Sequence, residues 1–156
     1  MDLRSIYMKL SEILIKKMTN NDINDILLLE EECFTDPWTK KMFEGEMEHE
    51  NVYYFLAKYN DCLIGYVGFW DITSECHITN MCIAPSMQNN GAGTFLMKYL
   101  VKFCRNKSIN TATLEVRRSN TVAINFYLKL GFKNEGIRKN YYTRPTEDAI
   151  IMWINF

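Results

Sequence analysis

The sequence lacks both a block of basic residues and a large net charge. Its 18 Lys and Arg stand against 19 Asp and Glu, which gives a formal net charge of -1. Proteins that bind nucleic acid through its phosphates carry a basic patch, and no Lys/Arg cluster in this chain is long enough to form one. The composition therefore argues against nucleic acid as a direct ligand.

Long apolar runs are also missing. No stretch approaches the roughly 20 apolar residues that cross a membrane. Charged side chains interrupt the opening segment, where a signal peptide would carry its apolar region. These residues are Asp2, Arg4, Lys9, Glu12, Lys16 and Lys17. We therefore expect a cytoplasmic protein that does not engage a membrane.

The cysteines form no C-x-x-C pair, and their number is odd. Because the chain has only two histidines, metal-ligand spacing is missing as well. We expect no metal site and interpret the cysteines as reduced thiols in the core. They are Cys33, Cys62, Cys76, Cys82 and Cys104.

No repeat, low-complexity tract or Pro/Gly-rich linker divides the 156 residues. A hydrophobic share of 47% with 13% aromatic residues is enough for the core of one globular domain. We predict a single domain over residues 13–156, preceded by an N-terminal arm of residues 1–12.

Hydrophobic periodicity and turn residues predict the element order β-α-α-β-β-β-α-β-α-β-β. The expected strands are residues 13–18, 52–58, 63–70, 76–83, 111–116, 132–141 and 148–155. The expected helices are residues 19–32, 39–47 and 121–130, and one more that begins at residues 91–93. This order predicts an α/β (α+β) fold, with a mixed, mostly antiparallel central sheet of about seven strands and helices on both faces.

A glycine-containing loop, Gln88-Asn89-Asn90-Gly91-Ala92-Gly93, joins an expected strand to an expected helix. Free N–H groups and the helix dipole at such a place bind phosphate oxygens, and glycine lets the anion approach the main chain. A plain turn, in which the glycines only satisfy backbone geometry, is the alternative. A P-loop and a dinucleotide fingerprint are disfavoured, because no Lys-Ser/Thr pair follows and Leu96 occupies the place of the third glycine.

Several motifs together resemble the GNAT acetyltransferases. Besides the Q-x-x-G-x-G loop after a strand, they are Leu114 to Asn120, Ala123-Ile124 and Phe126 to Phe132. Three further segments resemble the RimI branch of that family, which acetylates the N-terminal alanine of a small-subunit ribosomal protein. They are Pro37-Trp38, Arg138 to Tyr142 and Glu147 to Met152. The resemblance implies the GNAT fold, acetyl-CoA as co-substrate and the N-terminal peptide of a ribosomal protein as partner.

The resemblance also implies which residues bind the cofactor. The acetyl and pantetheine arm would lie along Met81, Cys82 and Ile83, whose main-chain groups would pair with it as a neighbouring strand does. The pyrophosphate would be held by Asn89, Asn90, Gly91, Ala92, Gly93 and Thr94. Asn120 would reach the cofactor from its helix start. An ordinary N-cap is the alternative role for Asn120, and the two roles are compatible.

Acetyl transfer needs one group that collects the proton of the amine and another that protonates the leaving thiolate. In the strand from Thr111, the period of two places Glu115 on one face as its only carboxylate. The resemblance implies that Glu115 is the general base and Tyr127 the general acid. The alternatives are a solvated Glu115 paired with an arginine and a Tyr127 that is only a core aromatic.

An α-amino group titrates near 7.7–8.0 and a lysine near 10.4, so the chemistry favours an N-terminus over a lysine side chain. Trp38, Tyr141 and Tyr142 would line the peptide groove, or else serve only in packing. A GNAT enzyme that acetylates a polyamine, amino acid or aminoglycoside is one rival interpretation. A non-catalytic acyl-CoA-binding module is another, although it would not need a base and an acid.

Two acidic stretches complete the candidate features. The run Glu30 to Glu32 lies at an expected helix C-terminus, where the helix dipole disfavours carboxylates, and is interpreted as a solvated face. A second set would form either an acidic lip or a solvated helix end. Its members are Glu44, Glu46, Glu48 and Glu50.

Overall fold

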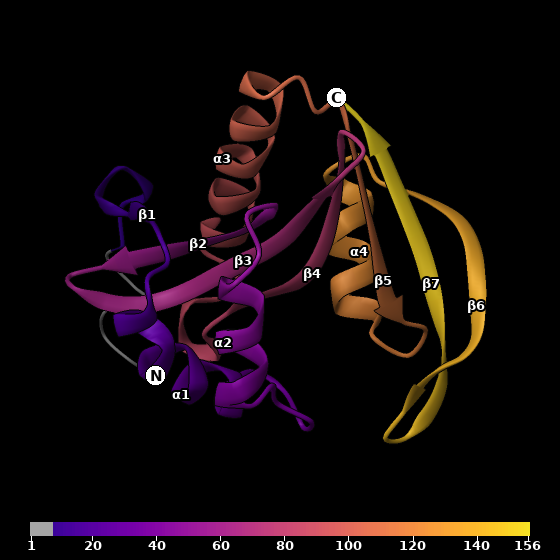
Figure 1. Ribbon diagram of the computed structural model, residues 1–156, viewed down its shortest axis with the longest axis horizontal. Helices are drawn as coiled ribbons and strands as arrows, with labels where there is room; N and C mark the ends of the chain where they lie inside the picture. Colours follow the sequence, from indigo (N-terminus) through magenta and orange to yellow (C-terminus); the bar gives the residue numbers. More distant parts are fainter. Residues whose placement is uncertain (1–7) are drawn as a thin grey trace.

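Seven strands form one sheet in the order β1-β2-β3-β4-β5-β7-β6 (Figure 1). The computed structural model describes residues 8–156. The strands are β1 Leu14–Lys17, β2 Val52–Tyr59, β3 Cys62–Ile72, β4 Glu75–Ile83, β5 Thr111–Arg117, β6 Lys133–Thr143 and β7 Thr146–Asn155. The helices are α1 Ile23–Cys33, α2 Lys40–Met47, α3 Ala92–Asn106 and α4 Thr121–Lys129. Three short 3-10 turns are η1 Leu10–Glu12, η2 Asn20–Asp22 and η3 Pro85–Met87.

The predicted order of helices and strands is confirmed, with shifts of one or two residues at most ends. The largest shift concerns the first helix, which begins as the turn η2 before α1. Its start is capped as the sequence predicts, because the main-chain N–H and the hydroxyl of Thr19 both donate to Asp22 Oδ2, at 2.8 and 3.0 Å. The arm stays a prediction, since its residues 1–7 lie outside the described residues.

The sheet is antiparallel except where β4 and β5 run side by side. That parallel pairing joins only Cys76–Ile78 to Ala112–Leu114. Beyond it, β4 continues to Ile83 and β5 to Arg117, but the two strands no longer pair with each other. Figure 1 shows them diverging toward their carboxyl ends. We call the opening between these two strand ends the splay.

Helices cover both faces of the sheet, as predicted (Figure 1). Successive residues of a strand point to opposite faces. On β2, Tyr54 packs its ring against Phe43 of α2, while Phe55 packs against Phe103 of α3, with ring centroids 5.9 and 4.9 Å apart. We call the face that α1 and α2 cover the front face, and the face that α3 and α4 cover the back face.

The structure corrects two interpretations made from the sequence. Glu30 is 1% exposed rather than solvated, because its carboxylate accepts hydrogen bonds from Tyr66 and from the main chain of Trp38. Cys62 is exposed at the start of β3 and is not a core thiol, whereas Cys76, Cys82 and Cys104 are buried. No helix within residues 8–156 is long and apolar enough to cross a membrane.

A pair of glycine substitutions tests how tightly the sheet is packed. A Cβ at Gly68 of β3 would lie 2.2 Å from Cε1 of the buried Tyr54, so Gly68→Ala is expected to lower the free energy of unfolding by about 1–3 kcal/mol. Gly45 of α2 has open space around it, and Gly45→Ala is expected to raise stability by about 0.5–1 kcal/mol. Urea unfolding of both variants measures this, and equal effects would contradict the packing.

Candidate active site

The loop before α3 presents main-chain N–H groups that have no internal acceptor. Gly91 is the N-cap of α3 with φ +84, and no side chain caps this helix. The first helical bond runs from Phe95 N to Gly91 O at 2.9 Å. Within residues 8–156, the N–H groups of residues 89–94 donate to no protein acceptor. Such a helix start suits a phosphate group, as the sequence predicts for the pyrophosphate.

The neutral side chains of the loop brace it from within. Gln88 Nε2 donates to Ile83 O at 3.0 Å, and Asn90 Nδ2 donates to Gln88 O at 3.2 Å. A Cβ at Gly93 would lie 3.2 Å from ring atoms of Phe126, so glycine lets the start of α3 approach α4 closely. The loop therefore offers oriented N–H groups rather than positive charge.

The helix that follows β5 begins differently. Asn120 is the N-cap of α4, and its Oδ1 accepts from Ala123 N at 3.1 Å. The N-cap role considered for Asn120 is confirmed, whereas a contact with cofactor stays a prediction. Because one N–H group of this first turn is already bonded, α3 has the better start for an anion.

The two strands of the splay turn main-chain groups that have no strand partner toward each other. Ala84 N donates to Ile64 O, so alternation in the β3–β4 ladder points the main-chain groups of Met81 and Ile83 away from β3. Arg118 N donates to Asp148 O, so those of Glu115 and Arg117 point away from β7. The carbonyls of Ile83 and Arg117 already accept from Gln88 Nε2 and Asn120 N. The other groups line the opening as the edge of a strand without a neighbour does, and an extended amide chain of the pantetheine type fits there.

Tyr127 lies on the back face of the splay. Its hydroxyl donates to Met81 Sδ at 3.8 Å, and its side chain is buried. Burial raises the pKa of Tyr127 well above its usual value, and the nearby Tyr142 and Cys82 add to the rise. Tyr127 therefore holds its proton throughout the physiological pH range.

Glu115 lies on the opposite, front face. Cys76 of β4 contacts Cys104 of α3 on the back face and pairs with Ala112 of β5, so Ala112 and Leu114 point back and Glu115 points forward. Glu115 Oε1 accepts from Arg138 Nε at 3.1 Å, across β7. The arginine partner that the sequence left open as an alternative is thus present, and the Arg138 side chain is 55% exposed.

The two tyrosines predicted for the peptide groove adjoin Glu115. Their rings make an edge contact with centroids 5.1 Å apart. Burial raises the pKa of Tyr141, and the Glu115 carboxylate adds to the rise. Burial likewise raises the pKa of Tyr142 to about 12. Residues from β4, β5, β6 and α4 therefore meet around the splay.

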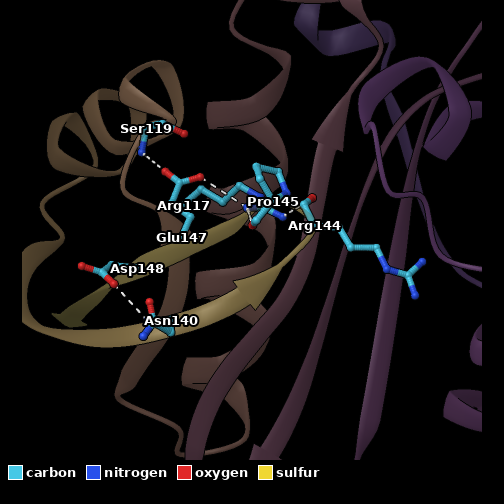
Figure 2. Close-up of polar contacts among 7 residues, drawn as sticks. All are labelled: Arg117, Ser119, Asn140, Arg144, Pro145, Glu147 and Asp148. Carbon is cyan, nitrogen blue, oxygen red and sulfur yellow. Dashed lines mark hydrogen bonds and ion pairs between the residues drawn. The ribbon is translucent and has the colours of Figure 1, made fainter.

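A polar cluster at the β6–β7 turn, shown in Figure 2, was not predicted from the sequence. Arg117 donates to the carbonyls of Arg144 and Pro145, each at 3.0 Å, while the Arg144 side chain points away from the cluster. Glu147 accepts from Ser119 N at 2.5 Å and from Arg117 at 3.3 Å. The bonds from Ser119, and then those from Arg117, lower the pKa of Glu147. The cluster ties the hairpin to the end of β5.

Arg117 also contacts one of the predicted groove residues. Its guanidinium carbon lies 4.2 Å from the ring centroid of Tyr142, a cation–π contact. One side chain thus anchors both the hairpin turn and a predicted groove residue. The segment that carries Glu147 and the strand that carries Arg117 were each noted in the sequence, but their contact spans 30 positions and has no local signal.

The remaining predicted groove features lie along α1 and α2. Trp38 is half-buried, its N–H donates to Glu30 Oε2 at 2.8 Å, and its ring packs on Phe43 at 5.4 Å. Glu46 accepts from Tyr54 and from Trp70 Nε1, at 3.3 and 2.9 Å. Glu46 therefore also helps to hold α2 against the sheet, and the acidic lip stays a prediction.

Comparisons with known proteins agree with this geometry. The model of the acetyltransferase (GNAT) family matches residues 23–132. A Bacillus subtilis protein provisionally named a ribosomal protein bS18-alanine N-acetyltransferase is 38% identical over 141 residues, covering 90% of this chain and 93% of the relative. The ribosomal protein bS18-alanine N-acetyltransferase of Escherichia coli K12 is 31% identical over 140 residues, covering 88% of this chain and 94% of the relative.

Solved structures give the same result. The crystal structure of the Escherichia coli ribosomal-protein-S18-alanine N-acetyltransferase matches with a TM-score of 0.85 at 30% identity, covering 92% of this chain and 93% of that chain. Ard1 from Thermoplasma volcanium matches with a TM-score of 0.85 over 92% of this chain and 97% of its own, and its 22% identity carries the fold alone. The chain therefore belongs to the GNAT family and is an acetyl-CoA-dependent N-acetyltransferase.

Proposed function

We propose that this enzyme acetylates the α-amino group of a protein N-terminus, and that its substrate is the N-terminal alanine of ribosomal protein bS18 in the cytoplasm. The names of its relatives support the substrate. The observation that best supports the chemistry is the placement of Glu115 and Tyr127 on opposite faces of one splay. An amine that enters from the front meets the carboxylate, and a leaving group at the back meets the phenol.

The cofactor is positioned by main-chain groups. When bound, acetyl-CoA supplies an acetyl group activated as a thioester. The N–H groups of residues 89–94 would hold its pyrophosphate, and the main-chain groups of Met81 and Glu115, with the N–H of Ile83, would pair with the amides of its pantetheine arm. This pairing would satisfy polar main-chain groups that the sheet itself leaves open.

Glu115 acts as the proton acceptor for the attacking amine, directly or through a water molecule. Arg138 Nε holds one carboxylate oxygen, so the other is available to the acceptor. Because Arg138 is more than half exposed, its guanidinium is free to swing into solvent as a peptide enters. Trp38, Tyr141 and Tyr142 form the walls of the groove through which that peptide reaches Glu115.

Tyr127 acts as the proton donor to the leaving sulfur. Its raised pKa keeps the proton on the hydroxyl until the sulfur becomes a thiolate, which has an ordinary pKa of about 8.5. The contact of the hydroxyl with Met81 Sδ supports this role, because it places the proton on the side of the splay along which the arm would run.

An alanine α-amine suits a site whose base is a single, partly exposed glutamate. Its pKa of about 7.7–8.0 leaves a fair share of it neutral at pH 7, so a partly exposed glutamate is a sufficient base. A lysine amine, near 10.4, would need a far stronger one. A module that only binds acyl-CoA would not need Glu115 and Tyr127 on the two faces of the splay.

The glycine loop is tested by Gly91→Ala. A side chain at φ +84 is strained, and its Cβ would lie 3.3 Å from Leu10 Cδ1, so the N–H groups should shift and the affinity for CoA should fall about tenfold. Gly131→Ala introduces the same kind of strain, at φ +100 beyond α4, and should leave CoA affinity unchanged. Calorimetry with CoA measures both. Equal affinities for both variants, or binding that disappears with a chelator, would reject the assignment.

The acceptor is tested with a panel of N-terminal peptides. Peptides that begin with alanine should be acetylated at the α-amine in preference to lysine side chains or polyamines, because the groove and the base fit a weakly basic amine. Mass spectrometry locates the acetyl group. N-blocked peptides that carry lysine should not react, and equal rates on them would contradict the proposed substrate.

The catalytic pair is tested through pH profiles. Glu115→Gln should lose most activity at low pH and recover as the amine deprotonates unaided. Tyr127→Phe should lower kcat by about 10²-fold, the lower end of the range for general acids, with CoA affinity nearly constant. Parental kcat in both variants across the pH range would make Glu115 a surface carboxylate and Tyr127 a core aromatic.

A further inference from the structure

A buried acceptor atom beside the splay has no partner. Asn80 of β4 is 9% exposed, and its Oδ1 accepts no hydrogen bond from residues 8–156. A buried polar atom without a partner costs free energy, and such groups are rare in folded proteins. The mechanism described above does not use Asn80.

The amide of Asn80 is oriented by a chain of buried polar groups. The Asn80 amide adjoins the hydroxyl of Tyr66, which is itself buried and donates to Glu30 Oε1. Glu30 Oε2 accepts from Trp38 N at 2.8 Å. The chain uses the N–H side of the amide, because the Tyr66 proton is committed to Glu30. The carbonyl oxygen of Asn80 is what remains.

Asn80 occupies a place that acetyl transfer makes significant. It lies two residues beyond Ile78, the last β4 residue that pairs with β5. Its partner Gly68 on β3 points to the front face, because a Cβ there would meet Tyr54, and paired residues share a face. The Asn80 side chain therefore also lies on the front face, the face of Glu115. Its own main chain pairs with Gly68 of β3, so it is not part of the open edge. Asn80 and Glu115 thus flank the splay on the side from which the acceptor enters.

We propose that Asn80 Oδ1 accepts a hydrogen bond from the α-amino group of the acceptor, opposite Glu115, with Tyr66 and Glu30 as positioning residues. The inference rests on the proposed function. An amine nitrogen held by one acceptor on β4 and another on β5 has its lone pair fixed between the strands, toward the acetyl carbon. An amide suits this place better than a carboxylate, since a second negative charge would keep the amine protonated.

Asn80→Leu is nearly isosteric and removes the orphan oxygen. If the atom serves the acceptor, kcat/KM for an alanine peptide should fall about 10-fold to 100-fold while CoA affinity stays constant. The midpoint of urea unfolding should change little, because the variant removes an unpaired buried oxygen together with the amide contact to Tyr66. A structural role would produce the opposite pattern, with lower stability and parental kcat/KM in the folded fraction, and that pattern would overturn the proposal.

A matched control comes from a second buried orphan atom of the described residues, Thr111 Oγ1, at the start of β5. Thr111→Val also removes a buried unpaired oxygen, but away from the splay, and should leave kcat/KM unchanged. An equal loss of kcat/KM in Asn80→Leu and Thr111→Val would overturn the proposal.

Two further variants keep the test decisive if Asn80→Leu does not fold. Asn80→Asp should shift the rise of kcat/KM to higher pH, because the added charge stabilises the ammonium form of the acceptor. Tyr66→Phe should lower kcat/KM, and the loss should vanish in an Asn80→Leu background if Tyr66 acts through Asn80. An unshifted pH profile, or losses that add fully, would overturn the role.

The same assays separate this proposal from the proposed function. The choice of the parent enzyme among alanine peptides, lysine peptides and polyamines tests the function alone. The kcat/KM of Asn80→Leu divided by that of the parent enzyme, measured on whichever amine the parent acetylates, tests Asn80 alone. If Asn80→Leu has the same kcat/KM as the parent on that amine, the Asn80 contact is overturned and the acceptor assignment stands.

Discussion

The loss of pairing between β4 and β5 after three residues is the constraint on which the rest of the structure depends. Beyond Ile78 and Leu114, main-chain groups of both strands point into the splay without a strand partner. Such groups need an external partner, so the sheet itself creates a binding edge. Helix α3 has Gly91 as its N-cap, and its first N–H groups have no acceptor within residues 8–156, whereas α4 is capped by Asn120. An anion therefore binds preferentially at the start of α3, and an extended amide chain can run from there along the splay.

A single irregularity in β4 sets which side chains serve which face of the splay. The β3–β4 register shifts between Gly68 and Phe69, which leaves Thr79 as the extra residue. Before the shift, Cys76 faces α3; after it, Asn80 faces the front and Met81 faces Tyr127 at the back. Without the extra residue, these two side chains would exchange faces. The bulge thus directs Asn80 to the front face, from which the amine would enter, and Met81 to the back face, where the thiol would leave.

Local signals predicted the elements, and long-range contacts decided the roles of several residues. The cap at Thr19, the turn glycine Gly91 and the N-cap Asn120 each act within a few positions and were visible in the sequence. Glu30 was not, because its burial depends on Tyr66, 36 positions away, and three consecutive glutamates resemble a solvated helix end. The bulged strand β4 carries no proline or glycine of its own, and Gly68 beside the bulge lies on β3, so neither the facing of Asn80 nor that of Met81 was accessible to pattern analysis.

Two glutamates lie on the front face, Glu30 on α1 and Glu115 on β5, and their surroundings give them opposite properties. Glu30 is 1% exposed and bonded on both oxygens, and removal of one partner from such a buried group is strongly destabilising, so it holds one arrangement. Glu115 is paired with an arginine that is 55% exposed, and exposed ion pairs contribute only about 0–1 kcal/mol. Exchange of Arg138 for an incoming amine therefore costs little. This difference in burial suits the reaction, although both residues are glutamates. Glu30 stays fixed, whereas the carboxylate of Glu115 is available for proton transfer.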